Sequence, residues 1–239
     1  VIMNFYSPFM YCLCFCMLCF GATLSAQLQD KDMIAFSPTA RQNVQLFWKD
    51  DQGKIIGSLG RLNNWLTGKQ QKLVFAMNGG MYMEDRAALG LFIQNGKVIR
   101  KLNKAKGYGN LYLMPNGVFY VDNKGKGHVS KTNSFPRSKN IQHATQWGAM
   151  LVIDGRIHPD FKKGSSNVHV RNGVGILPDG RMLFAMSRNT VNLYDFAEYF
   201  KNKGCKDALF LDGFVSRTWY PAGNWKQHDG HFVVIIGVE

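Results

Sequence analysis

Short apolar segments that meet at Asn-Gly or Asp-Gly pairs recur along the chain. The pairs and the segments beside them are Asn95-Gly96 between 89–93 and 97–99, Asn116-Gly117 between 111–114 and 118–121, Asp154-Gly155 after 150–153, and Asp179-Gly180 between 175–177 and 181–186. Both dipeptides accept the positive φ angles of tight turns between antiparallel strands. The pattern therefore predicts a hairpin at each site and a protein rich in antiparallel sheet.

Two other segments carry apolar residues at helical spacing. These residues are Leu193, Phe196, Ala197 and Phe200 in one segment, and Leu59, Leu62 and Leu66 in the other. Positions i, i+3, i+4 and i+7 form one face of an α-helix. We expect the helix that contains Leu193 to be capped by Thr190 or Asn192 and to end near Lys203. The helix that contains Leu59 is expected to span about residues 58–66.

Each predicted helix is followed by a short apolar strand that ends in a polar residue and glycine. Residues 73–77 lead into Asn78-Gly79-Gly80, and residues 208–211 lead into Asp212-Gly213. This order indicates either a weak internal repeat or only the common use of Asn, Asp and Gly at strand ends. We expect an α+β fold with mostly antiparallel or mixed β-sheets, hairpins and two or more packing helices, built as two intimately joined halves of one domain over residues 27–239.

The first 26 residues have the pattern of an export signal. No charged residue precedes Asp30, residues 9–20 are almost all apolar, and small residues dominate 21–26. An apolar stretch of about a dozen residues is shorter than the roughly 20 residues of a membrane span. We expect a signal peptide over residues 1–26 and a secreted or periplasmic protein with no stable membrane span after cleavage. A retained N-terminal membrane anchor is the alternative.

Four of the five cysteines lie inside this predicted signal, and Cys205 is the fifth. A mature chain with one cysteine forms no internal disulfide. Cys205 stands between a predicted helix end and an apolar strand, so we expect it to be a small buried residue rather than a nucleophile.

Basic residues clearly outnumber acidic ones. The chain has 29 Lys and Arg against 16 Asp and Glu, a net charge of +13. This balance favours an anionic partner. A content of 46% hydrophobic and 19% charged residues excludes a disordered chain. Because the lysines are scattered along expected loops of an exported chain, we do not expect nucleic acid as the partner.

Several common chemistries lack their motifs. The six histidines show no metal-ligand spacing, and the chain contains neither a phosphate-binding loop nor a Gly-x-Ser-x-Gly elbow. We therefore expect no metal ion and no organic cofactor, although one alternative below uses a divalent cation.

Polar residues at the ends of the two buried strands are the first candidates for a site. Asp212 follows four apolar residues, so desolvation could raise the pKa of its carboxyl group and suit it to acid or base chemistry. The alternative is a turn aspartate that binds its own backbone. Arg86, Arg171 and Arg217 could hold a phosphate, since a guanidinium group binds phosphate through two parallel hydrogen bonds.

Three motifs together resemble the phosphodiester glycosidase family. They are Asn78-Gly79-Gly80-Met81-Tyr82, Arg171-Asn172-Gly173-Val174-Gly175 and Leu211-Asp212-Gly213-Phe214-Val215-Ser216-Arg217-Thr218. They resemble the family's Asn-Gly-Gly-Phe-Phe, Arg-Thr-Ala-Ile-Gly and Leu-Asp-Gly-Gly-Gly-Ser motifs, in the same order. Phe214-Val215 replaces a glycine pair, a change expected to narrow the space beside Asp212. Asn172-Gly173 replaces Thr-Ala.

This resemblance implies an exported hydrolase of sugar-1-phosphodiester bonds, with a phosphorylated glycan or sugar-1-phosphodiester as its partner. Its implied residues fall into two groups. The catalytic group is Asp212, Glu84 and Arg171, and the substrate-binding group is Asn78, Gly79, Gly80, Tyr82, Arg86, Gln146, Gly213, Ser216 and Arg217. Trp147, Tyr82, Trp219 and Tyr220 could stack on a sugar, although aromatic residues are more often core.

Two other functions stay open at this point. One is a non-catalytic envelope protein that binds a glycan or an anionic polymer. The other is a metal-dependent phosphodiesterase in which Asp212, Asp85 and Glu84 coordinate a hard cation.

Overall fold

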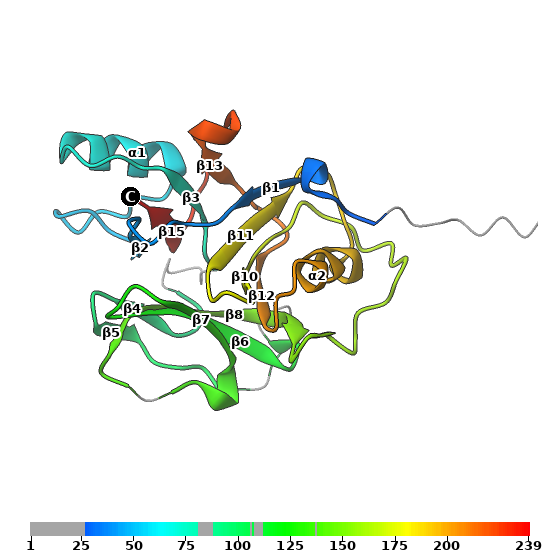
Figure 1. The fold of residues 1–239 in the computed structure, drawn as a ribbon. Helices are drawn as coiled ribbons and strands as arrows, with labels where there is room; N and C mark the ends of the chain where they lie inside the picture. Colours follow the sequence, from blue (N-terminus) through cyan, green and yellow to red (C-terminus); the bar gives the residue numbers. More distant parts are fainter. Residues whose placement is uncertain (1–26, 81–87, 106, 108–111, 137) are drawn as a thin grey trace, which may run out of the picture.

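The computed structural model describes residues 27–80, 88–105, 107, 112–136 and 138–239, so the predicted signal peptide lies outside the described residues. Within them the strands form two sheets, one of ten strands and one of five, and all strand pairs are antiparallel. The predicted combination of antiparallel sheets, hairpins and two helices is confirmed (Figure 1).

The larger sheet runs in the order β1-β11-β10-β12-β8-β4-β5, with β6, β7 and β9 attached beside β8. Its bounds are β1 Met33–Phe36, β4 Phe92–Gln94, β5 Lys97–Arg100, β6 Asn116–Asp122, β7 Gly127–Lys131, β8 Ile141–Ile153, β9 Arg156–Ile157, β10 Asn172–Ile176, β11 Met182–Ser187 and β12 Ala208–Asp212. The smaller sheet runs β14-β13-β3-β15-β2. Its bounds are β2 Val44–Phe47, β3 Phe75–Asn78, β13 Thr218–Tyr220, β14 Trp225–Lys226 and β15 Ile235–Val238.

The first helix, α1, spans Leu59–Gly68 and packs on the smaller sheet. Ser58 caps it, since its side chain accepts a hydrogen bond from the Arg61 backbone N–H. The predicted stripe of Leu59, Leu62 and Leu66 is buried in a cluster with side chains of that sheet. The predicted helix is thus confirmed, and it ends two residues later than expected.

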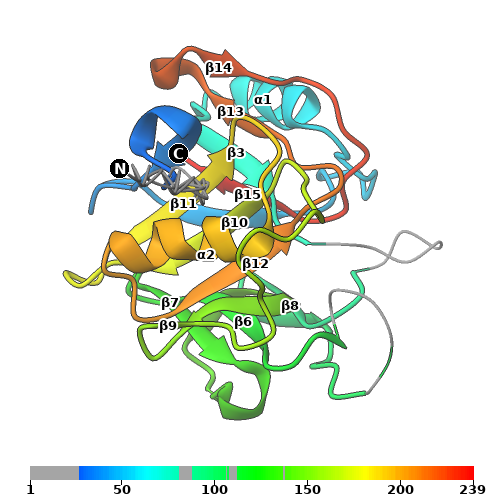
Figure 2. The ribbon, with the colours of Figure 1, turned by 90° about the vertical axis from the view of Figure 1, so that its right-hand side faces the viewer.

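The second helix, α2, spans Leu193–Asn202 and lies across a face of the larger sheet (Figure 2). Asn192 is its cap, with Oδ1 accepting a hydrogen bond from the Asp195 N–H at 2.9 Å. Phe196, Ala197 and Phe200 are buried in the main core as predicted. Neither helix among the described residues is long and apolar enough to span a membrane.

Three of the four predicted hairpins are confirmed. They are β4–β5 around Asn95-Gly96, β8–β9 around Asp154-Gly155, and β10–β11 around Asp179-Gly180. Asn95 and Asp154 both have a φ of 50°, and the glycines after them have φ values of 74° and 77°. Local turn chemistry is sufficient to fix these positions.

The hairpin predicted at Asn116-Gly117 is wrong. Both residues lie inside β6 and are buried, and the chain turns later, between β6 and β7. A Cβ atom at Gly117 would lie 2.8 Å from Leu209 Cδ1, so this glycine allows β6 to pack against β12. Close packing, rather than a turn, explains the Asn-Gly pair here.

Cys205 is buried in the main core, with 1% of its surface exposed. Burial raises the pKa of its thiol to about 12. The prediction that Cys205 is buried is confirmed, and a raised thiol pKa makes the nucleophilic thiolate form rare at neutral pH.

Candidate active site

The site is built where one strand from each sheet ends. Asn78 is the last residue of β3 in the smaller sheet, and Asp212 is the last residue of β12 in the larger sheet. Asn78 Nδ2 donates a hydrogen bond to Asp212 Oδ2 at 2.8 Å, and both side chains are buried. A buried polar pair therefore joins the two sheets at the ends of these strands.

The other oxygen of the Asn78 amide brings in two more segments. Asn78 Oδ1 accepts hydrogen bonds from Asn172 Nδ2 and from the Arg217 backbone N–H, both at 2.9 Å. Asn172 begins β10 and pairs with Asp212 across the sheet. The three sequence motifs, which are far apart along the chain, thus meet in one hydrogen-bond network.

The carboxyl group of Asp212 is bound on both oxygens. Oδ1 accepts hydrogen bonds from the backbone N–H groups of Phe214 at 2.6 Å and Val215 at 3.1 Å. Asp212 is therefore a turn aspartate, as the alternative interpretation held, and it also binds Asn78. Burial raises the pKa of Asp212, while these backbone hydrogen bonds and the one from Asn78 oppose the rise.

Arg171 is a buried cation held mainly by backbone oxygens. Its Nε donates to Val191 O at 2.8 Å, and Nη2 donates to Asn167 O at 2.8 Å and Oδ1 at 3.0 Å. Only 2% of the residue is exposed, and burial lowers its pKa to about 10, so it stays protonated at neutral pH. None of the ion pairs between described residues includes Arg171.

The remaining nitrogen of this guanidinium group, Nη1, faces Gly213. A Cβ atom built on Gly213 would lie 2.7 Å from Arg171 Nη1 and 2.7 Å from Phe210 Cζ. The absence of a side chain at Gly213 allows the cation to approach the turn that follows Asp212.

We expect Gly213→Ala to lower the free energy of unfolding by about 1–3 kcal/mol, because the added methyl group displaces the Arg171 guanidinium or the Phe210 ring. Urea denaturation measures this change. Gly68→Ala is the matched control, since Gly68 lies in α1 and has no atom within 4 Å of an added Cβ. The control should be neutral or stabilising by up to about 1 kcal/mol. Equal losses in both variants would contradict a tight contact at Gly213.

Gly79 and Gly80, which follow Asn78 directly, lie against β8. Gly79 O accepts a hydrogen bond from Thr145 Oγ1 at 2.8 Å, and Thr145 Oγ1 lies 3.2 Å from where a Cβ of Gly80 would be. Gln146 faces other partners. Its Oε1 accepts from the Leu91 and Asn103 N–H groups and its Nε2 donates to Asn103 O and Thr132 Oγ1, so its amide is fully engaged in holding loops.

Ser216 and Arg217 stabilise the turn after Asp212 in different ways. Ser216 Oγ donates to Asp212 O at 3.0 Å. The Arg217 guanidinium pairs with Asp229 at 2.9 Å in a partly exposed position, and its Nη1 donates to Ser216 O at 3.0 Å. A cavity of about 230 Å³ lies at this turn and is lined by Val215, Arg217, Asp229, Gly230, His231 and Phe232. Among the described residues, Arg217 therefore joins the network through its backbone N–H, which donates to Asn78 Oδ1.

Three predicted residues, Tyr82, Glu84 and Arg86, lie outside the described residues, and so does Asp85. Their roles stay predictions. Within the described part of the chain, no group of three or more His, Cys, Asp or Glu side chains could hold a metal ion.

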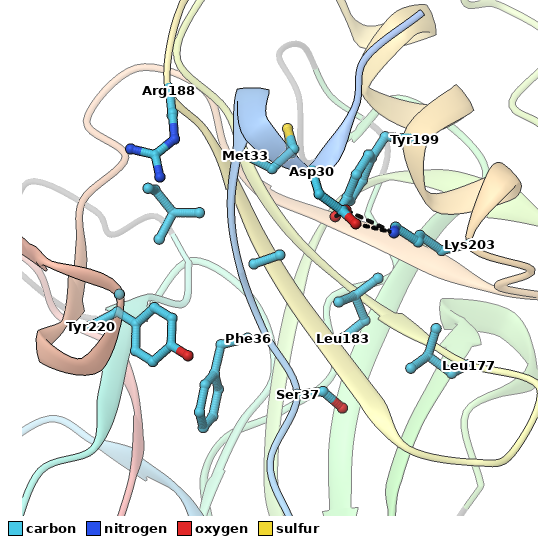
Figure 3. A pocket seen from close by; sticks show the side chains of 13 residues that line it. Asp30, Met33, Phe36, Ser37, Leu177, Leu183, Arg188, Tyr199, Lys203 and Tyr220 are labelled. Carbon is cyan, nitrogen blue, oxygen red and sulfur yellow. Dashed lines mark hydrogen bonds and ion pairs between the residues drawn. The ribbon is translucent and has the colours of Figure 1, made fainter.

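A separate cavity of about 440 Å³ lies beside β1 (Figure 3). There Asp30 accepts hydrogen bonds from Tyr199 Oη at 2.9 Å and Lys203 Nζ at 2.7 Å. Of the residues predicted from the sequence to contact the substrate, Tyr220 lines this cavity, while Asn78, Arg171 and Asp212 do not.

Sequence reasoning missed two parts of the site. Asn172 was noted only as a replacement for threonine, yet it donates to both the backbone and side-chain oxygens of Asn78. Thr145, which holds Gly79, carries no local signal within its long strand. The position of Asn172 directly after Arg171 in the second motif was the one available indication.

The phosphodiester glycosidase family model matches residues 71–234, a range that contains the whole network described above. The chain belongs to the phosphodiester glycosidase family. The chain is also similar to the uncharacterized protein YigE of Escherichia coli (strain K12). The two are 38% identical over 201 residues, which are 83% of this chain and 78% of YigE.

Two solved structures share the fold of this chain. The catalytic domain of zebrafish N-acetylglucosamine-1-phosphodiester alpha-N-acetylglucosaminidase, auto-inhibited by its pro-peptide, matches with a TM-score of 0.54 and 16% identity over 87% of this chain and 88% of that one. A hypothetical protein from Synechocystis matches with a TM-score of 0.53 and 11% identity over 89% of this chain and 60% of that one.

Proposed function

We propose that this protein is an exported hydrolase that cleaves sugar-1-phosphodiester bonds between the anomeric carbon and the phosphate oxygen. Family membership supports hydrolysis of this bond class. The observation that carries the proposal is the hydrogen bond between Asn78 and Asp212, which joins the ends of strands from two sheets within reach of a buried cation. Export rests on the apolar pattern of residues 1–26.

The described residues have distinct roles in this proposal. Arg171 Nη1, beside Gly213, binds the phosphate, since the other nitrogens of the guanidinium group are held by Val191 and Asn167. Asp212 acts near the anomeric carbon as acid, base or nucleophile. A carboxylate has about four acceptor positions, so Oδ2, which binds Asn78, keeps one for a water or sugar hydroxyl. Because phosphate is a good leaving group, one carboxyl group suffices.

Asn172 adds a further polar atom to this site. Its Oδ1 is buried and has no hydrogen-bond partner among the described residues, while its Nδ2 is bound to Asn78. An unpaired buried acceptor costs about 1–3 kcal/mol. A ligand or water that donates to Asn172 Oδ1 would recover this energy, which supports a ligand site at the network.

Product analysis tests the proposal. The chain from residue 27 onward is incubated with the methyl phosphodiester of N-acetylglucosamine 1-phosphate, with and without EDTA. We expect free sugar and methyl phosphate at the same rate in both conditions. Sugar 1-phosphate that disappears with EDTA would instead indicate a metal-dependent phosphodiesterase. Binding without turnover would indicate a glycan-binding protein, and either result would overturn the proposal.

A further inference from the structure

Large apolar residues are exposed around the turn that follows Asp212. Six such residues are exposed within the described part of the chain, and three of them, Val168, Phe214 and Val215, belong to two loops that meet beside the network. Phe214 is 87% exposed, Val168 is 42% exposed and Val215 is 37% exposed. We call these three residues the apolar rim. Exposed apolar patches commonly mark binding sites.

The position of Phe214 is fixed although its ring is exposed. Its backbone N–H donates to Asp212 Oδ1 at 2.6 Å, so the residue is tied directly to the network. The ring contacts His169 edge-on, with 6.5 Å between the ring centroids. The larger side chain therefore points outward and does not fill the space beside Asp212, in contrast to the narrowing expected from the sequence.

The other described aromatic candidates are less exposed than Phe214, and the half-buried Tyr220 lines the separate cavity beside β1. Trp147 is 1% exposed and Trp219 is 6% exposed, so both are core residues. An exposed Phe side chain forgoes the favourable free energy of burial, so its exposure calls for an explanation. Within the described residues, Phe214 is thus an exposed aromatic residue whose backbone N–H is bound directly to Asp212.

We propose that Phe214 is the platform on which a pyranose ring of the substrate stacks, and that it sets the affinity for the sugar. This inference rests on the proposed function. One face of a pyranose carries C–H groups that pack on an aromatic ring, while its hydroxyl groups need hydrogen-bond partners at the edge. His169 lies against the Phe214 ring, and Arg217 and Asp229 line a cavity together with Val215, so polar groups are close to the ring.

The mixed character of this surface favours a sugar over an alkyl chain. The apolar rim consists of one aromatic ring and two valines, and polar groups lie beside it. His169 contacts the Phe214 ring, and the Arg217–Asp229 ion pair lies in the cavity that Val215 lines. An alkyl chain would displace water from these polar groups and offer them no hydrogen bond in return. A sugar satisfies them and covers the ring.

Steady-state kinetics of Phe214 variants test the platform. We expect Phe214→Ala and Phe214→Leu to raise KM for the methyl phosphodiester about 3- to 10-fold with kcat unchanged, and Phe214→Trp to keep KM at or below the wild-type value. Val98→Ala, at an exposed apolar position on β5, is the matched control and should change neither constant. Wild-type KM in Phe214→Leu would overturn stacking, because leucine is apolar but not aromatic.

A second arm separates the sugar from the rest of the substrate. The rise in KM caused by Phe214→Ala should be equal for the methyl and octyl phosphodiesters. A rise in KM that is larger for the octyl ester would overturn the sugar assignment and would indicate that the apolar rim binds an alkyl chain. Calorimetric binding of free N-acetylglucosamine needs no turnover. Weaker binding to Phe214→Ala than to wild type supports the platform even if the wild-type protein hydrolyses nothing, and equal binding overturns it.

Discussion

The Asp212→Asn variant is expected to lose about 10²- to 10⁴-fold or more of the wild-type turnover. The change removes the carboxyl group that we assign to the anomeric carbon, while volume and shape stay the same. It also disturbs the network. Asn78 Nδ2 donates to Asp212 Oδ2, and the Phe214 N–H donates to Oδ1, so an amide at position 212 presents its NH₂ group to a donor in either orientation.

This clash gives the single variant a stability defect that must be separated from its chemical defect. Asn78 does not relieve it by rotating, because its Oδ1 accepts from Asn172 Nδ2 and from the Arg217 N–H. One unsatisfied buried donor costs about 1–3 kcal/mol. Removal of a desolvated carboxylate offsets part of this cost, since burial raises the pKa of Asp212 and so disfavours its charge.

The double variant Asn78→Asp/Asp212→Asn is the matched control. The amide at 212 then donates to the carboxylate at 78, and that carboxylate still accepts from Asn172 and from the Arg217 N–H. Every donor of the network again meets an acceptor. We expect the double variant to recover most of the free energy of unfolding lost by Asp212→Asn and none of the turnover, as measured by urea denaturation and by release of free sugar.

Two results would contradict this assignment. Turnover near the wild-type rate in Asp212→Asn would mean that another carboxyl group, such as Glu84, carries the chemistry. Turnover restored together with stability in the double variant would mean that the network needs only a carboxylate on either residue. The two variants thus separate a chemical role of Asp212 from its role as the turn aspartate.

Features of the fold that depend on neighbouring residues were predictable from the sequence. Asn192 as the cap of α2 and Asn95-Gly96 as the turn of β4–β5 follow from local hydrogen bonding and backbone conformation. Gly117 shows the limit of this reasoning. Its signal is the same dipeptide, but the packing of β6 against Leu209 determines its structure, and that contact joins residues far apart in sequence.

The site was predictable only as a set of motifs. Nothing local to Asn78 or Asp212 shows that β3 and β12, which belong to different sheets, end beside each other. The resemblance to a family brought these residues together before the structure did. It could not show that Asn172 binds Asn78, or that Phe214 points into solvent, because both depend on side-chain orientation.

Arg171 is expected to show the second large effect, on stability and on substrate capture together. Its Nε and Nη2 bind Val191 and Asn167, and its guanidinium lies 5.5 Å from the centre of the Phe210 ring. Hydrogen bonds from a charged group contribute about 1.5–3 kcal/mol each, and loss of one partner leaves buried carbonyl groups unsatisfied. Arg171→Ala should therefore lower the free energy of unfolding by about 3–5 kcal/mol.

The Arg171→Lys variant separates the two roles, because a lysine keeps the charge and most of the packing. One ammonium group lacks the forked geometry that reaches Val191 and Asn167 while Nη1 faces Gly213. We expect its KM for the methyl phosphodiester to rise about 10- to 100-fold, with little change between low and high salt, because a buried contact is poorly screened. The matched control is Arg217→Lys, whose partly exposed pair with Asp229 should cost about 1 kcal/mol of stability or less. If folded Arg171→Lys protein, assayed well below its melting temperature, kept the wild-type KM and kcat, Arg171 would be a structural residue and the phosphate would bind elsewhere.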